Sequence, residues 1–140
     1  MFKPQTESQI QGEFFTRIKY LEVKYPQLKL LHAVPNQGLS GKRGVIHTRK
    51  LKTEGLRPGY PDLCYPVKSG EYNSLHIEYK TPKGSLQPSQ KMMLRDLVKL
   101  GGSCCCICKS ADIGVEVVAW YLNGADPKSR PPKSKVLVWF

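Results

Sequence analysis

Two carboxylates and a lysine lie at a spacing that suits cleavage of a phosphate ester. Asp62 lies in GYPDL (59–63), and Glu78 and Lys80 lie in IEYK (77–80). Side chains alternate along a strand, so Glu78 and Lys80 share one face if this segment is extended. Carboxylates supply the hard oxygen ligands that Mg²⁺ prefers. A nearby lysine can position or deprotonate a water, or stabilise the charge that develops on the phosphorane.

The three side chains meet only if the two segments pair as a hairpin. We expect strands at 62–67 and 74–80, around a turn centred near residue 70 or 71. This turn places Asp62 opposite Glu78 or Lys80, and either register puts all three on one face. A slip of one residue would move Asp62 to the other face, so the register is a condition of the site. The alternative is that Glu78 and Lys80 are ordinary surface residues on the solvated side of a sheet.

Capping signals and apolar periodicity predict the elements around this hairpin. Thr6 and Gln9 fit a capping box at the start of a first helix. A long loop, with at most a short helix, is expected at 37–60. The same signals predict helices at about 6–25, 87–100 and 110–123, and further strands at 28–36 and 104–109. The order α-β-β-β-α-β-α indicates a mixed α/β layer with a central hairpin.

Other polar residues have two readings each. Glu7 begins the apolar stripe of the first helix and is expected to face the sheet as a third acidic group, or only to complement the helix dipole. Gln90 begins the stripe of a later helix, where it would orient a water or Lys80, or bond the backbone as a buried glutamine. His76 shares the face of Glu78 and is either a helper of the site or an ordinary strand residue.

The composition indicates a polyanionic partner. Lys and Arg number 22 against 11 Asp and Glu, a net charge of +11, and a small protein this basic usually meets nucleic acid. The alternatives are charge that only maintains solubility, or a ribosomal or membrane surface. The cations between residues 37 and 60 are candidates to contact DNA phosphates. The alternative is that they belong to a charged loop that only faces solvent. They are Lys42, Arg43, Arg49, Lys50, Lys52 and Arg57.

Cysteine usage and apolar runs bear on the compartment. Four of the five cysteines lie in CCCIC (104–108), which is too tightly packed for one zinc or iron–sulfur site. We read them as small buried residues of a strand. No run approaches the ~18 apolar residues of a membrane span, and the first residues hold no apolar signal core. We therefore expect a protein of the reducing cytoplasm that has no membrane partner.

Together these residues resemble the VRR-NUC family, a branch of the PD-(D/E)XK nucleases, and in size its standalone phage-type members. The resemblance covers about residues 5–124, so we expect a nuclease domain at 1–124. It implies an α/β, restriction-endonuclease-like fold with a mixed central sheet flanked by helices. The tail 125–140, which is basic and proline-rich with an apolar end, falls outside the family pattern. The matching elements are Glu7 in TESQIQ, VPNQG (34–38), Gly59 to Asp62, Glu78 to Lys80, and PSQ ending at Gln90.

The resemblance implies an endonuclease that depends on Mg²⁺, with Mn²⁺ as a substitute, and cuts branched DNA. Standalone members tend to be homodimers that resolve four-way (Holliday) junctions. The apolar tail VLVWF (136–140) could dock on the body of the protein or on a partner, and is one candidate dimer surface. Carried over by motif, the catalytic core is Asp62, Glu78 and Lys80, with Glu7 and Gln90 as accessory residues. The expected metal ligands are Glu7, Asp62, Glu78 and the backbone carbonyl of Tyr79.

Two other functions stay open at this point. One is a nuclease of the same chemistry that acts on flaps, nicks or plain duplex DNA. The other is a non-enzymatic DNA-binding module in which the acidic residues are incidental. The complete set of Asp62, Glu78 and Lys80 argues against the second.

Overall fold

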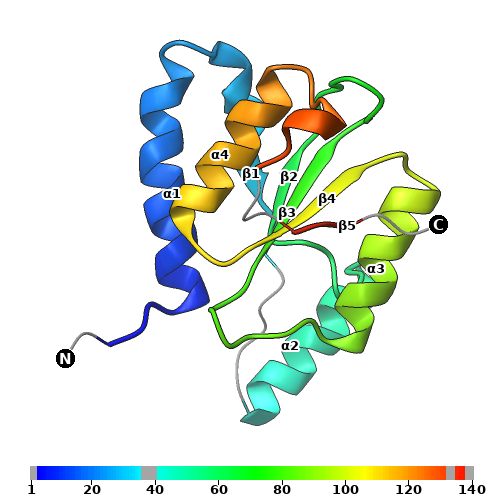
Figure 1. Ribbon diagram of the computed structural model, residues 1–140. Coiled ribbons are helices and arrows are strands. Elements are labelled where there is room, and N and C mark those ends of the chain that lie inside the picture. Colours follow the sequence, from blue (N-terminus) through cyan, green and yellow to red (C-terminus); the bar gives the residue numbers. More distant parts are fainter. Residues whose placement is uncertain (1–2, 36–40, 132–134, 138–140) are drawn as a thin grey trace.

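A mixed sheet lies at the centre of the computed structural model, which describes residues 3–35, 41–131 and 135–137 (Figure 1). Over these residues its strands are β1 (His32–Ala33), β2 (Leu63–Tyr65), β3 (Leu75–Tyr79), β4 (Cys104–Cys108) and β5 (Lys135–Leu137). They lie side by side in the order of the chain, and β3 and β4 are parallel while the other neighbours are antiparallel. The α/β class and the mixed sheet are as predicted.

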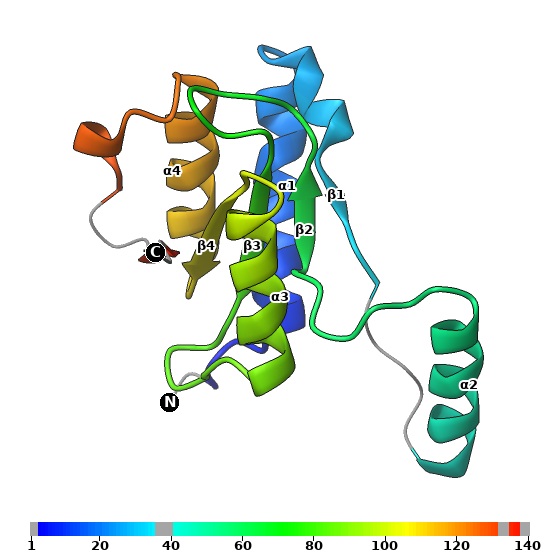
Figure 2. The ribbon, with the colours of Figure 1, turned by 90° about the vertical axis from the view of Figure 1, so that its right-hand side faces the viewer.

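Helices cover both faces of this sheet. Over the described residues the helices are α1 (Glu7–Glu22), α2 (Gly41–Thr53), α3 (Pro88–Lys99) and α4 (Ala111–Leu122), with 3-10 helices η1 (Pro26–Leu30) and η2 (Pro127–Ser129). In Figure 1, α1 and α4 lie together on one face and α3 lies on the other. Figure 2 shows α2 standing apart from the sheet, on the connection between β1 and β2. No helix of the described residues is long and apolar enough to cross a membrane.

Helix α1 begins where its capping box predicts. The Thr6 hydroxyl accepts from the Gln9 backbone N–H at 3.1 Å, and the Gln9 side chain accepts from the Thr6 N–H at 2.9 Å. These bonds satisfy two of the N–H groups that a helix start leaves without partners. Ile10, Phe14 and Ile18 are buried against the sheet, each at most 2 % exposed. The N-terminal residue of α1, Glu7, therefore has a fixed position beside the end of β3.

Strand β3 is buried on both faces. Its side chains point alternately into the main core and toward the candidate site. Leu75, Ile77 and Tyr79 belong to the main core under α1 and α4. The residues between them point to the α3 side, where Leu94 packs on Cys105 and Ile107 of β4. Glu78 therefore lies in the layer between the sheet and the start of α3.

Three sequence predictions need correction or extension. The predicted strand at 28–36 is wrong over its first half, because Pro26 starts the 3-10 helix η1 and leaves only the two residues of β1. The loop expected at 37–60 contains a 13-residue helix, α2. The last part of the tail pairs with β4 as the edge strand β5, while residues 138–140 lie outside the described residues.

Candidate active site

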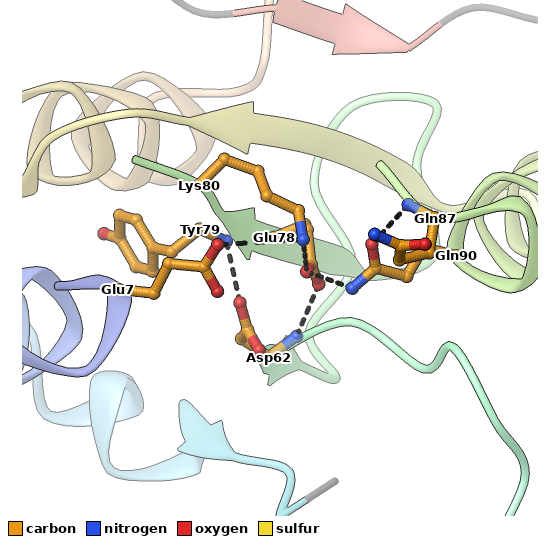
Figure 3. A network of polar contacts seen from close by, with 7 residues as sticks. All are labelled: Glu7, Asp62, Glu78, Tyr79, Lys80, Gln87 and Gln90. Atoms are coloured by element: carbon orange, nitrogen blue, oxygen red, sulfur yellow. Dashed lines mark hydrogen bonds and ion pairs between the residues drawn. The ribbon is translucent and has the colours of Figure 1, made fainter. Parts of the chain in front are cut away.

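Asp62 and Glu78 face each other across the β2–β3 hairpin. Leu63 pairs with Ile77, so one residue further along Asp62 lies opposite Glu78, as one of the two expected registers requires. The Asp62 N–H donates to Glu78 Oε2 at 3.2 Å, and the Tyr79 N–H donates to Asp62 Oδ2 at 2.8 Å (Figure 3). Each carboxylate is thus held by a backbone N–H of the opposite segment, which fixes their relative position.

Glu78 is a buried carboxylate that is surrounded by donors. It is 1 % exposed, its Oε1 accepts from Gln90 Nε2 at 2.8 Å, and Lys80 Nζ lies 3.5 Å from the same oxygen. Burial raises the pKa of Glu78 to about 7, helped by the neighbouring Asp62 carboxylate and opposed by Lys80 and the Asp62 N–H. Near neutral pH the carboxyl is therefore balanced between its protonated and ionised forms.

Lys80 connects the strand to the first helix. It is 6 % exposed, and its Nζ lies 3.8 Å from Glu7 Oε1 as well as 3.5 Å from Glu78 Oε1. The prediction that Glu7 faces the sheet is consistent with this contact. Burial raises the pKa of Asp62, with the Glu7 carboxylate adding to the effect and the Tyr79 N–H and Lys80 opposing it. The three carboxylates and the lysine therefore form one electrostatically coupled group.

Gln90 bonds the backbone, as one of its two readings predicts, but its other contact is with Glu78 and not with Lys80. Its Oε1 accepts from the Gln87 N–H at 2.8 Å, so the side chain is held at the start of α3. Its Nε2 is then directed to Glu78. Sequence reasoning missed the part played by Gln87, although the capping-box spacing of Gln87 and Gln90 around Pro88 was a signal for it.

Gly59 brings the Asp62 loop against α3. Its φ is +82°, and a Cβ at this position would lie 2.4 Å from the backbone oxygen of Ser89. A positive φ is strained for other residues, and a side chain would push the loop away from the helix. Gly59 therefore couples the position of Asp62 to the helix that supplies Gln90.

An open cavity of about 610 Å³ adjoins the carboxylates. Glu7 and Asp62 are part of its wall, together with the side of α1 and residues around β1. The remaining lining residues are Ser8, Gln11, Gly12, Phe15, Ala33, Val34 and Pro35. A substrate can therefore reach these two carboxylates from solvent.

The donor set fits a hard divalent cation. Glu7, Asp62 and Glu78 offer only oxygen atoms, and two of them have raised pKa values because they are buried near each other. A cation between them would relieve that repulsion. Within the described residues no three His, Cys, Asp or Glu side chains form a ready-made metal cage. The arrangement suits Mg²⁺, which is usually held by one or two carboxylates and keeps several waters.

The predicted DNA-contacting cations do not join this group. Arg49, Lys50 and Lys52 lie on α2, which stands apart from the sheet. Arg57 lines a separate cavity of about 400 Å³ with His32 and Tyr60. The side chains of Lys42 and Arg43 lie outside the described residues.

His76 and the cysteines of β4 are buried parts of the structure and not of the candidate site. His76 is 3 % exposed; its Nε2 hydrogen bonds to Ser74 Oγ at 3.1 Å, and its ring packs edge-on against Tyr60. Burial lowers its pKa to about 4, so it is neutral at physiological pH. The cysteines of β4 are free and buried, as predicted for small core residues.

Comparisons with known proteins agree with this geometry. The family model of the VRR-NUC domain matches residues 5–112 and ends within α4, short of the expected 124. A solved structure described as "VRR_NUC domain protein" superposes with a TM-score of 0.71 at 25% sequence identity, covering 88% of this chain and 93% of that chain. No curated protein matches the chain. The matched segment contains the group of polar residues around Glu78, and the chain belongs to the VRR-NUC family and is a nuclease of the PD-(D/E)XK type.

Proposed function

We propose that this protein is a divalent-metal-dependent endonuclease that cuts branched DNA, such as four-way junctions. The observation behind the proposal is the hydrogen-bonded group of Asp62, Glu78 and Lys80 beside an open cavity. Hydrolysis of a phosphodiester needs groups that hold an ion, orient water and stabilise negative charge, and this group offers all of them.

The ligands of the ion would be Asp62 and Glu78, with Glu7 and the backbone carbonyl of Tyr79. Mg²⁺ is the proposed ion and Mn²⁺ a substitute, because all of these donors are hard oxygens. When bound, such an ion lowers the pKa of a coordinated water and offsets the charge that develops on the phosphorus.

The protein's own residues would do the positioning. Gln90 and the Asp62 N–H hold the two oxygens of Glu78, so this carboxylate cannot rotate freely. The Lys80 ammonium, between Glu78 and Glu7, would orient the attacking water or stabilise the oxyanion. Gln90 is in this scheme a positioning residue that acts through Glu78.

Support for branched DNA comes from the resemblance to standalone VRR-NUC proteins, and support for a polyanion comes from the net charge of +11. Two symmetric cuts across a junction need two active sites, so the proposal includes a homodimer. A mass of one chain by light scattering at micromolar concentration would remove that part of it.

The test is cleavage of matched, end-labelled substrates: a four-way junction, a flap, a nicked duplex and a linear duplex. Each is incubated with Mg²⁺, with Mn²⁺ and with EDTA. The proposal predicts cutting that EDTA abolishes and that is fastest on the junction. Equal rates on all four substrates would leave a general nuclease, and tight binding without any cutting would support the non-enzymatic alternative.

A further inference from the structure

Another cavity has Lys80 in its wall. Its volume is about 370 Å³, and its wall contains three lysines, Lys80, Lys91 and Lys109. The remaining lining residues are Gly84, Ser85, Leu86 and Ile107, so no carboxylate lines it. The first cavity has the opposite character, because Glu7 and Asp62 line it. The catalytic group therefore lies between an acidic cavity and a basic one.

The lysines of the basic cavity come from three different elements. Lys80 follows β3, Lys91 lies near the start of α3, and Lys109 directly follows β4. The Lys109 ammonium donates to the Pro82 carbonyl at 2.9 Å, which holds it over the loop that connects β3 to α3. The Gly84 N–H closes a turn in this loop by donating to the Thr81 carbonyl at 2.9 Å. The three lysines are thus far apart in the sequence, and the fold brings them together.

Such a group is suited to a bound anion. Glu78 and Glu7 partly offset the charge of Lys80, but no carboxylate in the cavity wall offsets the charges of Lys91 and Lys109. Lys91 also lies in the part of α3 where the helix dipole favours negative charge. Lys80 belongs to both this wall and the catalytic group, so an anion here would lie beside the reacting phosphate.

We propose that the basic cavity binds the DNA phosphate that neighbours the scissile phosphate on the cut strand. This inference rests on the proposed nuclease function, because it takes Lys80 as the residue next to the reacting phosphate. Lys91 and Lys109 hold this neighbouring phosphate, and the contact fixes the register of the strand over Glu78 and Asp62. The ligand class is a phosphodiester, and no base is read at this site.

The experiment combines protein variants with neutralised phosphates. Lys91→Ala, Lys109→Ala and the double variant are compared with wild type on substrates that carry a single uncharged methylphosphonate at successive positions. Both lysines are exposed, so the variants are expected to fold. Lys99→Ala is the matched control, since it removes the same charge from the other end of α3.

Each lysine substitution is expected to raise KM and the Kd for DNA by about tenfold. A single methylphosphonate beside the cut is expected to weaken DNA binding by wild type by a similar factor. The same substitution is expected to cause no further loss of binding by the double variant. The KM and the Kd of Lys99→Ala are expected to stay within about twofold of the wild-type values. The proposal is overturned if the losses of DNA affinity from the lysine substitutions and from the methylphosphonate multiply at every methylphosphonate position. It is also overturned if Lys99→Ala loses as much affinity as Lys91→Ala.

Binding measured by fluorescence anisotropy in EDTA separates this inference from the proposed function. If wild type binds the substrates in EDTA but does not cut them when Mg²⁺ is supplied, the proposed function fails. The binding assay still decides whether the cavity holds a phosphate, because it compares the lysine variants with wild type on the charged and the methylphosphonate substrates. Failure of that cycle in a wild-type protein that cuts normally overturns the phosphate site alone.

Discussion

The Gln90 side chain joins the start of α3 to strand β3, because its Nε2 donates to Glu78 Oε1 at 2.8 Å while its Oε1 accepts from the Gln87 N–H at 2.8 Å. The bond has a direction: an N–H donor stabilises the ionised form of Glu78, the form that can bind a cation. Gln90 therefore fixes the orientation of the buried carboxylate, and its hydrogen bond favours the ionised form.

Replacing Gln90 by Met keeps most of the side-chain volume and removes the donor. We expect kcat to fall by about ten- to hundredfold with KM nearly unchanged, because Glu78 loses its fixed orientation. The acidic limb of the rate–pH profile moves to higher pH, because the ionised form of Glu78 has lost a hydrogen bond. A lower kcat with an unmoved pH profile would limit Gln90 to a packing role.

Glu78 makes the metal-free protein less stable as the pH rises. Its pKa is about 7 in the fold against an ordinary value of 4.5, so between these values the folded state binds more protons than the unfolded state. The free energy of unfolding therefore falls as pH rises through this window, by an amount on the order of 3 kcal/mol, and the loss is complete above pH 7.

Glu78→Gln removes this titration. In EDTA, urea denaturation between pH 4.5 and 8 is expected to give a shallower loss of stability for the variant than for wild type. Asp62, whose pKa is also raised, leaves a slope of the same sign. The same pH dependence in both proteins would contradict the buried, proton-binding state of Glu78.

Gly59→Ala is expected to reduce both stability and activity. The φ of +82° and the approach of 2.4 Å to the Ser89 oxygen leave no room for a methyl group. The cost is about 2–4 kcal/mol, measured as a lower midpoint of thermal or urea unfolding. The control is Gly12→Ala in α1, where a Cβ would meet nothing within 4 Å. That variant should be more stable than wild type by about 0.5–1 kcal/mol, since alanine favours a helix interior.

Lys80→Ala removes the cation between Glu78 and Glu7. Single-turnover cleavage is expected to slow by at least about a hundredfold, while calorimetry still detects Mg²⁺ binding to the carboxylates. Lys80→Arg keeps the charge and should recover part of the rate. Cleavage by Lys80→Ala at the wild-type rate would show that Lys80 has no part in the reaction.

The elements nearest the site were predictable because their signals are local. The capping box at Thr6, the proline at the start of α3 and the glycines after it mark helix ends directly in the sequence. The position of the turn left two registers, which both put Asp62 on the face of Glu78 and Lys80, and the structure has the one that pairs Asp62 with Glu78. Of the two readings of Glu7, the contact with Lys80 is consistent with the one in which it faces the sheet.

The remaining features depend on contacts that the sequence pattern does not contain. The apolar run after Pro26 fits a strand as well as it fits the 3-10 helix η1, because short apolar runs have no distinctive period. Helix α2 stands apart from the sheet (Figure 2), and none of its described side chains, at residues 45–53, is buried, so no regular apolar face reveals it. The pairing of β5 with β4 and the close approach of Gly59 to Ser89 join segments far apart in the chain.

The most direct test of the account is single-turnover cleavage of a four-way junction by wild type and Asp62→Asn in Mg²⁺. Asparagine keeps the size of the side chain and an acceptor for the Tyr79 N–H, and it removes only the charge. The account predicts that the variant folds and binds the junction as wild type does but forms no product above the level seen in EDTA. Mg²⁺-dependent cleavage by Asp62→Asn at the wild-type rate would contradict it.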